Sequence, residues 1–77
     1  MNKEKILLEQ VIKGRTYRLI EVSDFKTVIK WDIVEVFKYQ GSDYEDYERI
    51  KEIWIDEDNN IESAECRFYE FIQELEN

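Results

Sequence analysis

The residues best suited to chemistry lie between Ser42 and Asn60, where carboxylates alternate with aromatic rings. The stretch opens with two D-Y-E triplets and ends in the acidic run IDEDNN. Carboxylates pair bidentately with arginine, and tyrosine offers a rigid apolar ring with a polar tip, so both types suit a protein interface. A solvated turn with its tyrosines at a sheet edge would give the same pattern. The first interpretation predicts a partner-binding surface made of Asp43, Tyr44, Glu45, Asp46, Tyr47, Glu48, Asp56, Glu57 and Asp58.

Enzymatic chemistry has little support in the sequence. The chain contains no histidine, which is the commonest general base and metal ligand near neutral pH. Its one cysteine, Cys66, lies beside the apolar stripe of a predicted helix, where we expect a small core residue and no nucleophile. The two glycines cannot build a phosphate-binding loop. We therefore expect a protein that is not an enzyme and needs no cofactor.

A calcium-binding loop is the metal motif that the sequence approaches most closely. Asp56, Asp58 and Asn60 match the spacing of its first ligands. The position that needs a glycine for the sharp turn is Ile61, and the position that needs a bidentate glutamate is Arg67. We therefore predict no dedicated metal site.

The charge of the chain is strongly one-sided. Residues 1–42 carry eight basic and six acidic side chains, whereas residues 43–77 carry three basic and thirteen acidic ones, which gives the net charge of −8. The second half would repel phosphate, so direct binding of nucleic acid is disfavoured. A basic patch on another protein is the natural complement. Acidity that serves solubility alone is the alternative.

The length of 77 residues suffices for a single domain, residues 1–77, with one modest core. Eleven aromatic residues indicate that this core folds. The lone cysteine excludes an internal disulfide, and the first apolar run, residues 6–8, is too short for a signal peptide or a membrane span. We therefore expect a cytoplasmic protein without membrane contact.

The N-terminal element has two competing interpretations. A helix over residues 3–13, ended by Gly14, is favoured by four apolar residues at helical spacing, namely Leu7, Leu8, Val11 and Ile12. The alternative is a hairpin that turns at Lys13–Gly14 and pairs Leu8 with Leu19 and Glu9 with Arg18. Neither face of that hairpin is uniformly apolar, so we favour the helix.

The other elements follow from alternation and periodicity. Strands are predicted over residues 16–22, 27–39 and about 47–55, the second of them in the middle of the sheet with a bulge near Ile33. Asn59 and Glu62 indicate a capping box for a C-terminal helix with the stripe Ile61, Ala64, Phe68, Ile72 and Leu75. The predicted fold is α+β in the order αβββα, a three-stranded antiparallel sheet with an N-terminal and a C-terminal helix, and ββββα is the alternative.

In this element order and in its acidic segments DYEDYE and IDEDNN, the chain resembles the small acidic phage anti-CRISPR proteins that block the RNA-guided nuclease of type II systems by imitating DNA. The resemblance covers the whole chain and involves no shared motif, so no functional residue of that group is carried over. It implies an inhibitor that occupies the basic cleft in which the nuclease would grip its target duplex.

Two functions therefore compete. The first is a non-enzymatic inhibitor that binds a nucleic-acid-handling protein through its acidic, tyrosine-bearing face by DNA mimicry. The second is a small scaffolding domain that self-associates through sheet aromatics such as Trp31 and Phe37, with acidity serving only solubility.

Overall fold

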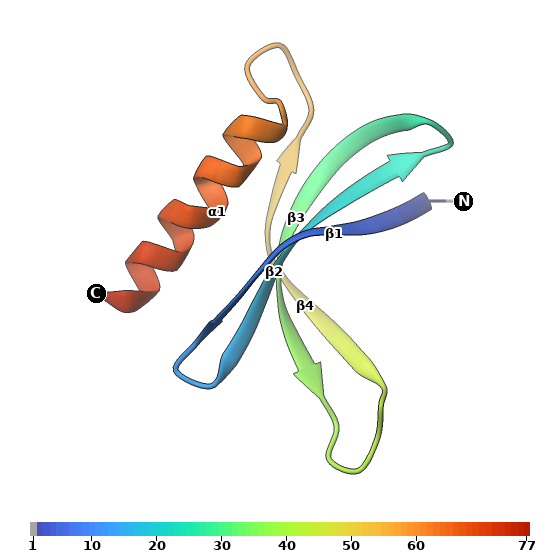
Figure 1. Ribbon diagram of the computed structural model, residues 1–77. Coiled ribbons are helices and arrows are strands. Elements are labelled where there is room, and N and C mark those ends of the chain that lie inside the picture. Colours follow the sequence, from blue (N-terminus) through green and yellow to red (C-terminus); the bar gives the residue numbers. More distant parts are fainter. Residues whose placement is uncertain (1) are drawn as a thin grey trace.

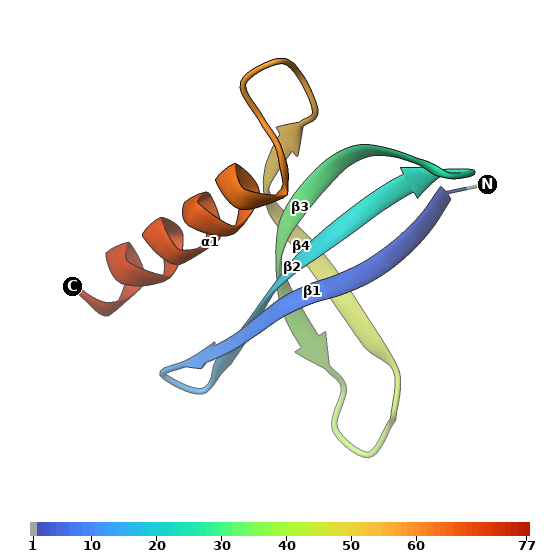
Figure 2. The same ribbon diagram turned by 45° about the horizontal axis from the view of Figure 1, so that its top comes forward.

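The computed structural model describes residues 2–77, which form one four-stranded antiparallel sheet and one helix (Figure 1). The elements are β1 (Asn2–Ile12), β2 (Arg15–Asp24), β3 (Thr27–Lys38), β4 (Glu45–Trp54) and α1 (Ile61–Glu76). The strands lie side by side in chain order, so each connection between them is a hairpin. α1 lies against one face of the sheet (Figure 2), and we refer to the opposite face as the open face.

The predicted N-terminal helix and the predicted three-stranded sheet are both wrong. Residues 2–12 form an edge strand that pairs with β2 in the alternative register, with Leu8 opposite Leu19 and Glu9 opposite Arg18. The physical reason is a bulge between Ile6 and Leu8, which moves the apolar side chains from one face to the other. An alternating pattern that is interrupted in this way imitates helical spacing.

The turn between β1 and β2 explains the role of Gly14. Lys13 and Gly14 both have positive φ angles, of 53° and 79°, which is the backbone of a two-residue hairpin turn whose twist matches the strands. Gly14 therefore closes a hairpin and does not end a helix.

Bulges also bend the interior of the sheet. β3 is an interior strand, as predicted, and the register of β3 and β4 shifts beside Ile33, where a bulge was expected. The extra residue is however Ile50 on β4, and Ile29 on β3 is a further one opposite β2. Bulges increase the right-handed twist of strands, and the long strands accordingly cross steeply in Figure 1.

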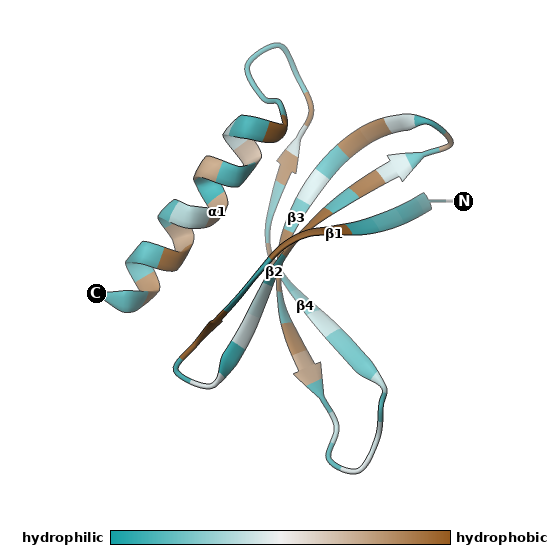
Figure 3. Ribbon diagram, viewed as in Figure 1, coloured by the Kyte–Doolittle hydropathy of each residue, from teal (hydrophilic) through white to brown (hydrophobic). Residues whose placement is uncertain are grey.

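The main core lies between the sheet and α1. It joins Ala64, Phe68 and Ile72 of the helix to six strand residues, Ile12, Tyr17, Leu19, Trp31, Ile33 and Ile53. These three helix residues confirm the centre of the predicted stripe, although Ile61 in the first turn is exposed. Figure 3 shows the helix alternating between apolar and polar residues, as one buried face requires.

The ends of α1 are held by specific hydrogen bonds. Asn60 is the N-cap and forms a reciprocal capping box with Ser63, so the predicted box of Asn59 and Glu62 is wrong by one position. At the other end, Lys13 Nζ donates to the carbonyl oxygen of Leu75 over 3.4 Å, which supplies positive charge where the helix dipole favours it. Cys66 is exposed on this helix, and its predicted core position is wrong.

A second, smaller core lies on the open face. Ile20, Val22 and Val34 are buried there, with Ile29 and Val36 packed around them. No helix of residues 2–77 covers this face, yet all three side chains are at most 5% exposed. The open face is therefore a surface with its own buried floor.

Candidate protein-binding surface

The end of the β3–β4 hairpin projects away from α1 as an arm, which we define as residues 37–48 (Figure 1). The arm consists of the end of β3, the loop and the start of β4, and all of its residues, the aromatic ones included, are exposed. Tyr44 is 63% and Tyr39 is 56% exposed, and Phe37 and Tyr47 are exposed to a smaller extent. Four exposed aromatic rings on one projecting segment are typical of an interaction surface.

The tip of the arm is ordered by its own contacts. The rings of Tyr39 and Tyr44 stack with their centroids 6.0 Å apart and their planes 22° from parallel. The Ser42 amide donates to the carbonyl of Tyr39 over 3.1 Å, and the Tyr44 amide donates to the Ser42 hydroxyl over 3.0 Å. The two rings are thus fixed in place before any partner arrives, which lowers the entropy lost on binding.

Glu45 and Tyr47 serve an internal clamp. The Arg18 guanidinium donates to both carboxylate oxygens of Glu45 at 3.2 Å, to Glu9 at 2.9 Å and to the Tyr47 hydroxyl at 3.1 Å. Its carbon lies 5.9 Å from the centroid of the Tyr47 ring. The Glu45 hydrogen bonds, before the others, raise the pKa of Arg18 above its ordinary value. The charge of Glu45 is therefore largely neutralised by Arg18, so this carboxylate is not free to pair with a partner.

The other carboxylates of the arm are free to pair with cations of a partner. Asp43, Asp46 and Glu48 form no ion pair with a lysine or arginine of residues 2–77. Glu48 also lies directly opposite Glu35 in the β3–β4 register, a like-charge pair that costs stability. Asp46 and Glu48 share one face of β4, where Phe37 lies opposite Asp46, whereas Tyr47 points to the other face with Glu45. The arm therefore carries unpaired acids and exposed aromatic rings along the same short segment.

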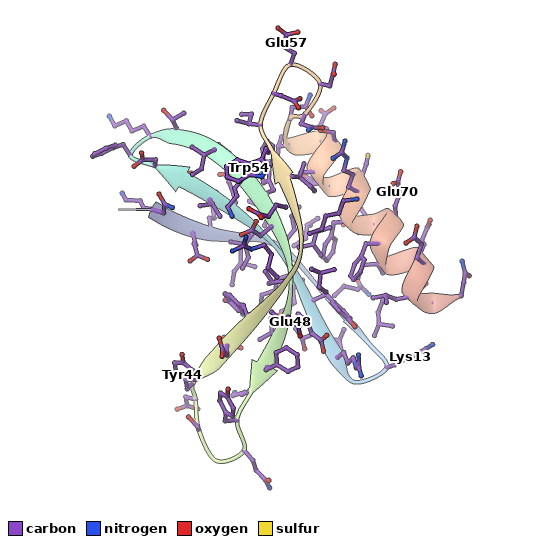
Figure 4. All side chains as sticks on the ribbon, turned by 180° about the vertical axis from the view of Figure 1, so that it is seen from behind. Lys13, Tyr44, Glu48, Trp54, Glu57 and Glu70 are labelled. Carbon is purple, nitrogen blue, oxygen red and sulfur yellow. The ribbon has the colours of Figure 1, made fainter. Side chains whose placement is uncertain are left out.

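The second predicted acidic segment lies at the far end of β4. Six strand residues, 49–54, separate it from the arm, which is about 20 Å, and Figure 4 shows Tyr44 and Glu57 at opposite ends of the molecule. Asp56 accepts the amides of Asp58 and Asn59 at 2.8 and 2.9 Å and so shapes the loop, while Glu57 and Asp58 are exposed. The nine predicted residues therefore form two surfaces and not one.

Most of the negative charge lies on a surface that sequence reasoning passed over. Residues 55–77 hold eight acidic side chains and one basic one, so they account for −7 of the net −8. None of these eight carboxylates pairs with a lysine or arginine of residues 2–77. Glu70 points away from the sheet in Figure 4. The helical period already indicated this acidic outer face, because Glu62, Glu70 and Glu74 fall opposite the apolar stripe.

A charged network on the open face also escaped prediction. Glu52 accepts hydrogen bonds at 2.7 Å from Lys30 and lies 2.7 Å from Arg49. The Lys30 contact, followed by that of Arg49, lowers the pKa of Glu52, and Glu52 in turn raises the pKa values of both cations. Asp32 lies beside them, 3.3 Å from Lys30. These residues come from two strands, and their meeting depends on a register that the sequence does not state.

The comparisons with protein families, curated proteins and solved structures find no match for this chain. Within residues 2–77, no three or more histidine, cysteine, aspartate or glutamate side chains are grouped so as to hold a metal ion. The helix of the described chain is too short and too polar to cross a membrane. The surface of the molecule is thus the basis for a functional proposal.

Proposed function

We propose that this chain is a non-enzymatic inhibitor that binds a nucleic-acid-handling protein through its arm, in the manner of a DNA mimic. The observation that supports this proposal is that Asp43, Asp46 and Glu48, all without internal ion pairs, lie on the same projecting arm as four exposed aromatic rings. A protein that binds nucleic acid presents arginines and lysines placed for phosphates. Such cations would pair with the arm carboxylates, and the rings would supply the buried contact area.

The acidic face of α1 supports the arm at longer range. Five carboxylates over sixteen helical residues give one charge per about 5 Å of helix axis, against about 3.4 Å for one DNA strand. This field is sparser than that of a duplex, so we assign it the role of speeding the approach of a basic partner. We place the encounter in the cytoplasm, where a single exposed cysteine stays reduced.

The test is a charge reversal on the folded domain. Asp43, Asp46 and Glu48 are replaced together by lysine, and target cleavage by a type II RNA-guided nuclease is measured with and without each protein. We expect the natural chain to inhibit and the triple variant to lose inhibition, with steep salt dependence for the natural chain. The matched control reverses Glu62, Glu70 and Glu74 on α1 and should slow association with less loss of affinity. Full inhibition by a folded arm variant would refute the proposal.

The alternative function is self-association through sheet aromatics, and the first residue expected to mediate it, Trp31, is buried. Trp31 is 2% exposed and donates its indole hydrogen to Glu21, so it is unavailable to a second copy. Phe37 is exposed, but it belongs to the acidic arm. Both edge strands also carry a bulge near their middle, which discourages edge-to-edge pairing. Light scattering that finds a salt-insensitive dimer would favour this alternative.

A further inference from the structure

The open face contains a hollow of about 260 Å³ to which all four strands contribute. Val22 and Val34 form its apolar floor, and both are buried. Its polar lining includes Glu4 of β1, Lys30 and Asp32 of β3, and Tyr47 and Arg49 of β4. The hollow lies on the face opposite α1 and has no part in the helix-covered core.

Asp32 is the unusual residue of this hollow. It is 9% exposed, and its Oδ1 atom is buried without a hydrogen-bond partner among residues 2–77. Lys30 Nζ forms an ion pair with Oδ1 over 3.3 Å, while its shorter contact, at 2.7 Å, is with Glu52. Arg49 Nε is 3.9 Å from the other oxygen. Asp32 Oδ1 thus has an ion pair but no well-formed hydrogen bond, so a further donor at this carboxylate would be favourable.

The charges around the hollow are also unequal. Lys30 and Arg49 face three carboxylates, those of Asp32, Glu52 and Glu4. Glu4 forms no ion pair with a cation of residues 2–77. The next cation on this face, Arg18, is already held by Glu9 and Glu45. One positive charge would therefore balance the group.

We propose that the hollow binds a guanidinium group, which donates to Asp32 Oδ1 on one side and to Glu4 on the other. Glu4 lies opposite Val22, and Val22 lies opposite Lys30, which is two residues before Asp32 on β3. The backbones of the two acids are therefore roughly 10 Å apart across the sheet and about 7 Å apart along it. A planar guanidinium has donors on several edges and can bridge two carboxylates, whereas the donors of an ammonium surround one atom. Its flat faces are weakly hydrated and suit the valine floor.

Two sources offer this chemistry, a free small molecule and an arginine side chain of a protein partner. The experiment follows the backbone amide resonances of the full chain by NMR during titration with methylguanidinium chloride, with a blocked Gly-Arg-Gly peptide, and with methylammonium chloride as the comparison. We expect saturable shifts at residues 22, 32 and 34, with dissociation constants on the order of millimolar. Tighter binding of the peptide assigns the site to a partner's arginine, and equal binding assigns it to a free guanidinium compound.

The variants make the test specific. Glu4→Gln removes an exposed carboxylate and should weaken guanidinium binding at least severalfold in a folded domain, and Asp32→Asn should weaken it further. The matched control Glu70→Gln on α1 should bind like the natural chain, as should the triple lysine variant of the arm, since none of its three residues lines the hollow. Absence of saturable shifts up to roughly 50 mM, equal binding of methylammonium, or unchanged binding by Glu4→Gln would overturn the proposal and leave the arm function standing.

Discussion

The replacement Phe68→Ala tests whether α1 is the element that stabilises this fold. Phe68 is fully buried at the centre of the helix-side core. Removing a buried phenylalanine ring costs about 3–5 kcal/mol from lost transfer energy and the remaining cavity. A domain of 77 residues holds about 4–12 kcal/mol in total. The variant should therefore keep little stability, and at the lower end of that range it should be unfolded.

The assay is thermal and urea unfolding, followed by far-ultraviolet circular dichroism and by tryptophan fluorescence. We expect the midpoint temperature to fall by about 12 °C or more, because each kcal/mol corresponds to at least about 4 °C in a domain of this size. The urea slope should stay unchanged if the folded and unfolded states keep their surface areas.

The control is the same deletion at an exposed site. Phe25 is 81% exposed at the β2–β3 turn, so Phe25→Ala removes identical atoms without opening a cavity and should change stability by less than about 0.5 kcal/mol. Equal losses for the two variants would show that α1 does not bury Phe68 against the sheet, and the reasoning about the core would fail.

Three further predictions concern single residues. Asn60→Ala breaks the reciprocal capping box of α1 and should cost about 0.5–2 kcal/mol in urea unfolding, whereas Asn59→Ala should cost less. Phe25→Asn should raise stability by about 1 kcal/mol, because Phe25 has a φ of 54° that asparagine tolerates better. Lys30 and Arg49 lower the pKa of Glu52, so its carboxylate stabilises the fold above its unfolded pKa and this contribution is lost as pH falls through the folded value. As the pH falls below about 4.5, the midpoint temperature of thermal unfolding should therefore decrease more steeply for the natural chain than for Glu52→Gln.

The fold was predictable wherever the side-chain pattern is regular. The stripe of α1 has an uninterrupted helical period, and its centre is buried as expected. β3 alternates for most of its length and is an interior strand. The prediction for β1 was wrong because one extra residue, Leu7, shifts the alternation of side chains by one position. A strand pattern with one such shift in eleven residues cannot be told from a helix by periodicity alone.

The candidate surface was predictable in composition but not in geometry. The D-Y-E triplets indicated exposed tyrosines and acids, and the arm carries them. That Arg18 neutralises Glu45 follows from the pairing of β2 with β3 and of β3 with β4, since the two residues are 27 positions apart in the chain. The burial of Asp32 was not predicted, because it depends on neighbours from β2 and β4 that no local pattern encodes.

The order of the strands also governs how the chain reaches its native state. Each hairpin joins neighbours in sequence, so its closure costs little entropy. The docking of α1 differs, because its Leu75 carbonyl meets Lys13, which is 62 residues earlier. We therefore expect the four strands to pair first and α1 to pack against the sheet last. During synthesis, the four strands leave the ribosome before α1 does. The apolar face of the sheet that α1 later covers is then exposed to solvent, and we expect the chain to be most prone to aggregation in that interval.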